Sequence, residues 1–165
     1  MKNFWLSLPA KLREASDGLG LLALRIWLAQ EFLHAGLMKL HHGRLAPEWF
    51  VNLSFPFPVR LLSEDQNWVA AGLGETVFGV LLLIGLQTRL ASLGLLFITW
   101  VAVYTVHFDL GFAGWDQIET DMGQGFKLPL MMACMLLATL TQGGGRWSAD
   151  RVLCRYFASA TVRSV

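Results

Sequence analysis

Residues 89–108, RLASLGLLFITWVAVYTVHF, are the stretch that decides the fold. No charged residue follows Arg89 in this stretch, and its apolar side chains fall on every side of a helical wheel. A soluble helix keeps a polar face, whereas a helix that is apolar all round is buried or surrounded by lipid. About 20 mostly apolar residues are enough to cross a bilayer. The stretch therefore predicts a membrane-spanning helix and disfavours a soluble helical bundle.

Three other segments have a similar length and character, at residues 18–40, 68–86 and 126–142. The connection at Gln87–Thr88 is so short that the helices on either side of it must be antiparallel neighbours. Residues 43–67, with several prolines, and the glycine-rich, acidic residues 109–125 are predicted to be loops. The predicted fold is all-α: one integral membrane four-helix bundle over residues 1–165, with a basic amphipathic tail helix at its C-terminal end.

The composition agrees with a membrane protein. The 165-residue chain is 55% hydrophobic and only 15% charged, whereas an ordinary soluble domain is about 25% charged. A net charge of +1 without a basic stripe excludes nucleic acid as a partner. Cys134 and Cys154 match neither a disulfide framework nor a zinc motif. Residues 1–18 lack the apolar core of a signal peptide.

The distribution of positive charge predicts the orientation of the four spans. The side that would hold both termini and the 87–89 connection carries Lys2, Lys11, Arg13, Arg89, Arg146, Arg151, Arg155 and Arg163. The other side carries Arg44 and Arg60, with Lys39 and Lys127 at its border. Cytoplasmic loops are enriched in lysine and arginine. We therefore expect a multi-pass protein of the bacterial inner membrane with both termini in the cytoplasm.

Polar side chains inside the predicted spans concentrate toward the periplasmic end. They are Gln30, Glu31, His34, Lys39, Glu75, His107 and Lys127. At about 100° per residue, one stripe of the first helix holds Gln30, His34, Met38 and His41, with Glu31 beside it. We expect this stripe to face Glu75, about seven residues below the outer surface, and His107. Arg25 points away from the stripe, to snorkel or to pair with a neighbouring helix, and Lys39 lies close enough to the outer interface to snorkel.

This cluster is compatible with three kinds of chemistry. Carboxylates and imidazoles near the interface can exchange protons with a quinone, and histidine suits this role because its ordinary pKa is near 6.5. Imidazole and thioether groups can instead hold copper or another transition metal, and the residues for that alternative are His34, Met38, His41, His42 and His107. In a third alternative the buried charges dock a partner protein, or only satisfy one another and set the helix register. No CxxC, Walker or GxGxxG motif points to another cofactor.

Three motifs resemble the DoxX family of bacterial four-helix membrane proteins. They are LRIWLAQEFLHAGLMKL (24–40), GETVFGVLLLIGLQTRLASLGLL (74–96) and GGGRWSADRVL (143–153), in the family's order. The matching positions are Arg25, Gly36, Lys39, Glu75, Arg89, Arg146, Ser148 and Asp150. The resemblance implies an association with quinone-linked oxidoreduction, thiol stress or metal-responsive genes. It also implies structural roles for Arg25, Gly36, Arg89, Arg146, Ser148 and Asp150.

These observations lead to one main hypothesis. The chain is expected to be a redox-associated or quinone-interacting membrane subunit, possessing a polar pocket that opens toward the periplasm and working with a partner oxidoreductase. Glu31, His34 and Glu75 would handle protons or quinone oxygens, and Lys39 or Lys127 would balance charge. The alternatives are a copper-handling membrane protein and a non-catalytic assembly subunit for a membrane partner.

Overall fold

The structure is a computed structural model that describes residues 18–162. The cations Lys2, Lys11, Arg13 and Arg163, which contribute to the predicted orientation, lie outside the described residues. The helices are α2 (Leu19–His42), α3 (Glu48–Val51), η1 (Val59–Leu61), α4 (Glu64–Ile84), α5 (Thr88–Thr105), η2 (Gly111–Asp116), α6 (Lys127–Gln142) and α7 (Ala149–Val162). The strands β1 (Glu119–Thr120) and β2 (Gly123–Gln124) pair antiparallel as a small hairpin. The prediction of a mostly helical chain is confirmed.

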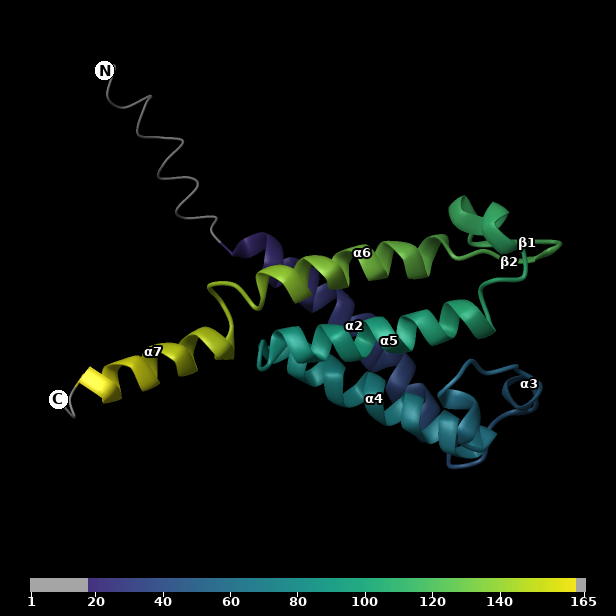
Figure 1. Cartoon of the computed structure of the whole chain (residues 1–165), viewed down its shortest axis with the longest axis horizontal. Coiled ribbons are helices and arrows are strands. Elements are labelled where there is room, and N and C mark those ends of the chain that lie inside the picture. The colour runs from purple at the N-terminus through teal and green to yellow at the C-terminus, as the bar shows by residue number, and fades with distance from the viewer. Residues whose placement is uncertain (1–17, 163–165) are drawn as a thin grey trace, which may run out of the picture.

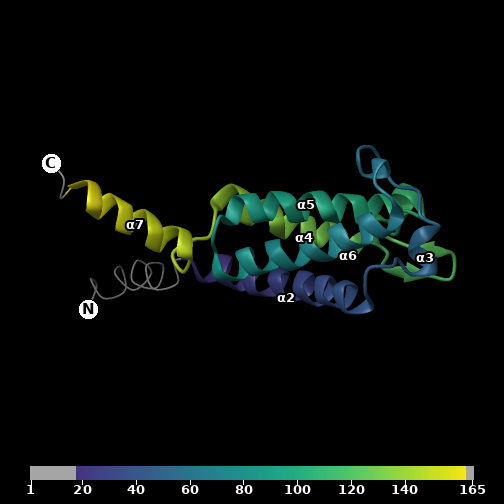
Figure 2. The same ribbon diagram turned by 90° about the horizontal axis from the view of Figure 1, so that it is seen from below.

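The long helices α2, α4, α5 and α6 lie side by side (Figure 1 and Figure 2). Each of them packs on two of the others: α2 on α4 and α6, and α5 on α4 and α6. We call the end that holds the start of α2, the α4–α5 turn and the start of α7 the terminal end. The opposite end, which holds α3, η2 and the β hairpin, is the loop end (Figure 1). The α4–α5 turn makes these two helices antiparallel neighbours, as the short connection predicts.

Helix α4 begins four residues earlier than predicted. Ser63 and Gln66 form a capping box, in which the Ser63 hydroxyl accepts from the Gln66 N–H and the Gln66 side chain accepts from the Ser63 N–H. This arrangement satisfies two N–H groups that a helix start leaves unpaired. The earlier start places Glu75 eleven residues into the helix. Its carboxylate therefore lies near the middle of α4, deeper than the predicted seven residues.

Small residues bring α2 and α4 into close contact. A Cβ atom added at Gly36 would lie 2.5 Å from the Thr76 hydroxyl oxygen and 2.9 Å from the Gly72 carbonyl oxygen. Helices that approach this closely need glycine at the crossing. The contact determines which side of α2 faces the bundle. That side carries Arg25, Leu28, Ala29, Phe32 and Gly36, and all of these are buried.

The core of the bundle is apolar, with one buried polar contact between α5 and α6. Its fully covered side chains are Leu28, Phe32, Leu82, Ala91, Leu95 and Leu136. The hydroxyls of Ser92 and Thr139 lie 2.7 Å apart across α5 and α6, and both also bond to carbonyls of their own helices. These buried hydroxyls are therefore satisfied within the helix pair.

Two of the helices, α4 and α5, are long and apolar enough to cross a membrane by length and composition. Helix α6 is apolar but has only 16 residues. Helix α2 is long, with 24 residues, and carries Arg25, Glu31 and Lys39 along its length. Sixteen residues rise about 24 Å, which is slightly less than the roughly 30 Å of a hydrocarbon core.

Arg25 joins three parts of the chain at the terminal end. Its guanidinium donates to the carbonyls of Leu82 and Leu83 at the end of α4, at 2.8 and 2.7 Å. It also donates to the carbonyls of Gly144 and Trp147 in the loop before α7, at 2.8 and 2.9 Å. The last carbonyls of a helix lack partners within it, and a cation there complements the helix dipole. Arg25 is 1% exposed, so the expectation that it snorkels is wrong. The alternative, in which Arg25 pairs with a neighbouring helix, agrees with its bonds to the end of α4.

Asp150, at the start of α7, connects this helix to the α4–α5 turn at the terminal end. Its carboxylate accepts from the backbone N–H of Gln87 at 2.7 Å, and from the N–H and hydroxyl of Thr88 at 3.0 and 2.9 Å. Its own N–H donates to the Gly85 carbonyl at 2.9 Å. We call Arg25, Asp150 and the backbone they hold the terminal clasp. The clasp gives two of the family-like positions an architectural role.

Candidate functional site

The described residues form a large, partly open apolar cavity between α4, α5 and the segment 43–63. Its volume is about 980 Å³. Along α5 it extends from Leu90 to Thr105, a length of about 22 Å at 1.5 Å per residue, and His107 lines it beyond the end of that helix. Aromatic side chains that line it are Trp49, Phe50, Phe55, Phe78 and Phe97. The shape and lining are those of a site for a long apolar molecule with a polar head, since ligand cavities combine apolar walls with a few placed polar groups.

An ion pair lies on the wall of this cavity. The Lys39 ammonium, from α2, is 2.7 and 3.0 Å from the two carboxylate oxygens of Glu75, from α4. The side chains are only 15% and 9% exposed. It is the one Lys/Arg–Asp/Glu ion pair within the part of the chain that the structure describes. The expectation that Lys39 snorkels is therefore wrong, because its ammonium turns inward to Glu75.

Trp68 packs against this ion pair. Its ring lies 6.0 Å from the Lys39 ammonium, within reach of a cation–π contact. The ring is nearly fully buried and packs edge-on against Phe50, Trp49 and His42. Among the described residues its indole N–H is a buried polar group that has no hydrogen-bond partner. Such groups are rare in native proteins. Trp68 is packed behind the ion pair and is not among the residues that line the cavity.

Two more polar side chains line the cavity near the loop end. The Asn67 amide donates to the Val59 carbonyl at 3.2 Å and holds the segment that covers the cavity. His107 follows the end of α5 by two residues. Burial lowers the pKa of His107 below its ordinary value, and a hydrogen bond with Gln124 and the charge of Asp109 oppose that shift. His107 is therefore neutral at pH 7, with one nitrogen to donate and one to accept.

The predicted stripe of α2 does not face this cavity. Its residues Gln30, Glu31, His34, Met38 and His41 are all exposed on the outer side of the helix. The expectation that the stripe faces Glu75 and His107 is therefore wrong. The helical wheel gives the angle between side chains of one helix, but the Gly36 contact with α4 decides which side is covered. An assembly role stays a prediction, and this outward stripe is the surface on which such a partner would lie.

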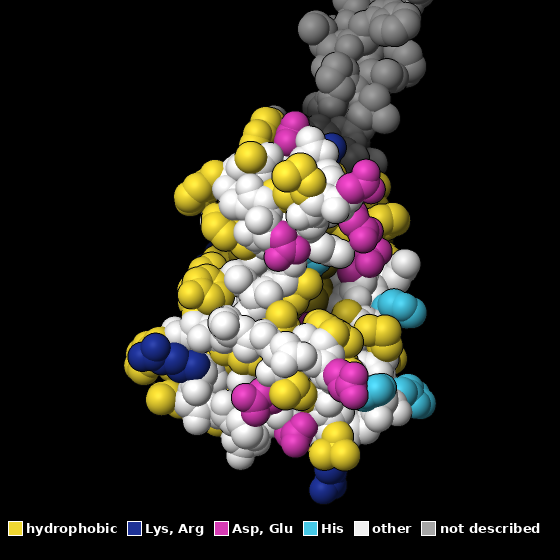
Figure 3. Space-filling view, turned by 90° about the vertical axis from the view of Figure 1, so that its right-hand side faces the viewer, with side chains coloured by type: hydrophobic (Ala, Val, Ile, Leu, Met, Phe, Trp, Pro, Cys, Tyr) yellow, Lys and Arg dark blue, Asp and Glu magenta, His cyan; other side chains and the backbone are white. Residues whose placement is uncertain are grey.

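The remaining predicted site residues are also apart from the cavity. Lys127 is exposed at the start of α6 and does not line it, so Lys39 rather than Lys127 balances Glu75. His42 is exposed and contacts Trp68 with its ring edge. At the loop end, histidines gather at one side while acidic side chains are spread across the surface (Figure 3). No group of three or more His, Cys, Asp or Glu side chains within residues 18–162 is arranged to hold a metal ion.

The sequence-based prediction missed most of the cavity wall. Trp49, Phe50 and Phe55 come from the segment predicted to be a loop, and Phe50 is buried against Trp68. The signal available was the dense alternation of aromatic residues and prolines between residues 47 and 58. Such a segment is too apolar for a solvated loop and is expected to cover an apolar surface.

Comparison with known proteins relates most of the chain to membrane proteins. A model of the DoxX family matches residues 20–108. An uncharacterized protein of Haemophilus influenzae is 36% identical over 149 residues, which cover 89% of this chain and 91% of that protein. An uncharacterized membrane protein of Mycobacterium tuberculosis is 29% identical over 157 residues, covering 93% of each. No solved structure matches the chain.

Proposed function

Because the chain belongs to the DoxX family of membrane proteins, we propose that it is a quinone-binding membrane subunit of a redox system. The single observation that carries this proposal is the cavity beside α4 and α5, with the Lys39–Glu75 ion pair on its wall. In this proposal α2, α4, α5 and α6 all cross the inner membrane. The terminal end lies in the cytoplasm, and the loop end lies in the periplasm.

The charges of the described residues support this orientation. The terminal end carries five described cations, Arg25, Arg89, Arg146, Arg151 and Arg155, whereas the loop end carries Arg44, Arg60 and Lys127 and most of the acidic residues. Lysine and arginine decide orientation, and acids contribute little. The exposed apolar side chains of α4 and α5 outside the cavity, such as Val80, Trp100 and Tyr104, then face lipid. The short α6 is accommodated by little tilt or by local thinning of the bilayer.

The cavity has the features that an isoprenoid quinone needs. Its walls between α4 and α5 are apolar over about 22 Å, which suits a prenyl tail. Its polar groups, from Lys39, Asn67, Glu75 and His107, lie from the middle of α4 to the loop end. The head of a quinone has carbonyl oxygens, which accept hydrogen bonds. The Lys39 ammonium and the His107 imidazole N–H are donors that suit them.

At the quinone head, the lining residues would bind a head-group oxygen, transfer protons and exclude water. A bound quinone supplies the capacity to take up or release two electrons together with two protons, and a partner oxidoreductase exchanges the electrons. The Lys39 ammonium donates a hydrogen bond to a head-group oxygen, and Glu75 keeps that ammonium charged and in place. His107, near the loop end, passes protons between the cavity and the periplasmic surface. The covering segment with Phe50 keeps bulk water away from the head.

A cavity-filling substitution tests this proposal. Ala71 lines the cavity from α4 and is half-buried. We expect Ala71→Phe to lower quinone binding at least about tenfold, since a phenyl group occupies the space that the head needs and a tenfold change corresponds to about 1.4 kcal/mol. The measurement is quinone retained per protein in lipid nanodiscs, extracted and quantified by chromatography.

The matched control is Ala23→Phe, at an exposed position of α2 away from the cavity. It adds the same side chain and should leave the retained quinone unchanged. Wild-type protein that retains no quinone above empty nanodiscs contradicts the proposal, as does equal retention by Ala71→Phe and wild type. A thermal melt of each variant confirms that the comparison is made between folded proteins.

A further inference from the structure

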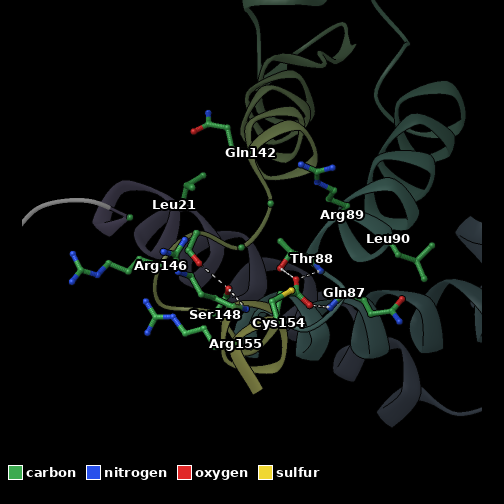
Figure 4. Close-up of a pocket in the computed structure, with 16 residues that line it drawn as sticks. Leu21, Gln87, Thr88, Arg89, Leu90, Gln142, Arg146, Ser148, Cys154 and Arg155 are labelled. Atoms are coloured by element: carbon green, nitrogen blue, oxygen red, sulfur yellow. Dashed lines mark hydrogen bonds between the residues drawn. The ribbon is translucent and has the colours of Figure 1, made fainter. Parts of the chain in front are cut away.

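A second cavity lies at the terminal end, on the far side of the molecule from the loop-end polar groups. Its volume is about 770 Å³, and it lies between the start of α5, the loop 142–148 and the start of α7. Figure 4 shows Arg89 on α5, Arg146 in the loop and Arg155 on α7 around it. Arg151 of α7 also lines it. Neither the redox proposal nor the comparisons assign a role to this cavity.

Positive charge is in excess among the residues that line the cavity. Arg89, Arg151 and Arg155 line the cavity, and the one carboxylate among the described lining residues is that of Asp150. Both oxygens of Asp150 already accept hydrogen bonds from Gln87 and Thr88 in the terminal clasp. The guanidinium groups of Arg151 and Arg155 make no ion pair among the described residues. The clasp therefore occupies the one acid among the described lining residues, and Arg151 and Arg155 give the cavity positive charge.

The clasp also gives the cavity a fixed shape. Ser148 bonds to the Gly145 carbonyl and accepts from the Arg151 N–H, which holds the first turn of α7. Gly144 packs so closely that a Cβ atom there would lie 2.6 Å from both Ser148 and Thr88. Arg89 donates to the Thr141 carbonyl at 3.2 Å, which holds its side chain toward the end of α6. The arginines thus project from a braced loop and two helix ends.

We propose that this cavity binds a phosphate group, carried either by an anionic phospholipid head group or by a soluble phosphate compound. Arginine presents a planar fork of donors that matches phosphate oxygens. Basic pockets at the cytoplasmic ends of membrane helices bind anionic lipid head groups. This inference is independent of the quinone cavity, because the two cavities share only Leu90.

The test compares two arms with the full chain in nanodiscs. In the lipid arm, native mass spectrometry measures retention of phosphatidylglycerol or cardiolipin against phosphatidylcholine. In the soluble arm, nanodiscs of phosphatidylcholine are titrated with inorganic phosphate by calorimetry. The variant is Arg151→Gln with Arg155→Gln, at two exposed positions of α7. Each arginine near a membrane surface is worth about fivefold in affinity, so the pair should weaken binding about 25-fold.

The control removes the same charge at the loop end, through Arg44→Gln with Arg60→Gln, and should leave binding unchanged. Arg89→Gln is a second variant within the cavity and should weaken binding about fivefold. Retention of anionic lipid that depends on Arg151 and Arg155 supports the lipid source, and phosphate binding with the same dependence supports the soluble source. Binding in neither arm, or an equal loss in the loop-end control, overturns the proposal.

Discussion

Glu75→Leu alone should lower the free energy of unfolding by about 3–5 kcal/mol, and Lys39→Met alone should cost about as much. Each variant leaves one buried charge without its partner. The resulting loss of stability is much larger than the net contribution of the intact ion pair to the free energy of unfolding. The double variant, Lys39→Met with Glu75→Leu, should recover most of the stability because it buries apolar groups of similar size instead of two charges. The measurement is a thermal or denaturant melt of each purified variant in the same detergent.

The matched control for this series is Glu31→Leu. Glu31 is a carboxylate on α2 that is exposed and outside the ion pair, so its removal should change stability by less than about 0.5 kcal/mol. Equal losses for the single and double variants would contradict the account of the pair. The double variant also separates the role of these residues in stability from their role in quinone binding, since we expect it to fold and yet to lose quinone binding.

Arg25→Lys should be the second severe substitution, with a loss of at least about 3 kcal/mol. The guanidinium makes four hydrogen bonds to carbonyls of two separate segments, and bonds to charged groups are worth about 1.5–3 kcal/mol each. A lysine keeps the charge but has a single nitrogen that cannot reach both segments in the same planar geometry. Melting of the purified variant measures the loss.

Arg44→Lys is the control for the arginine-to-lysine change, because Arg44 is exposed at the loop end. It should leave the melting midpoint unchanged. Limited proteolysis adds a local readout, since loosening of the clasp should expose residues 143–148 to cleavage before the rest of the chain. An Arg25→Lys protein with wild-type melting and cleavage would show that the clasp does not hold the terminal end.

The helices could be predicted largely from the sequence, whereas the contacts of the terminal clasp could not. Helix positions follow from local composition, so the predicted spans 18–40 and 126–142 differ from α2 and α6 by at most two residues at each end. The motif positions Arg25 and Asp150 indicated residues with an architectural role, although their carbonyl and N–H partners came only from the fold. The predicted start of α4 was late because the capping box at Ser63 was overlooked.

The cavity could not be predicted in the same way. The helical wheel showed that Lys39 leaves the polar stripe of α2, but only the close contact at Gly36 shows that the Lys39 side turns toward Glu75. The aromatic residues between 47 and 58 indicate a segment that covers an apolar surface, but they do not show which surface, because that depends on the long-range contact made where the segment 43–63 folds back. Glu31 and His34 were predicted to be pocket residues although they are exposed, because the helical wheel does not show which side of α2 faces α4.

The most direct test of the quinone proposal is photolabelling by a short-chain azidoquinone, followed by mass spectrometry of the labelled peptides. We predict that the label falls on the cavity walls of α4 and α5, around Phe78 and Phe97, and that an excess of natural quinone removes it. A label that resists competition, or that falls on the outward face of α2 instead, would contradict the proposal.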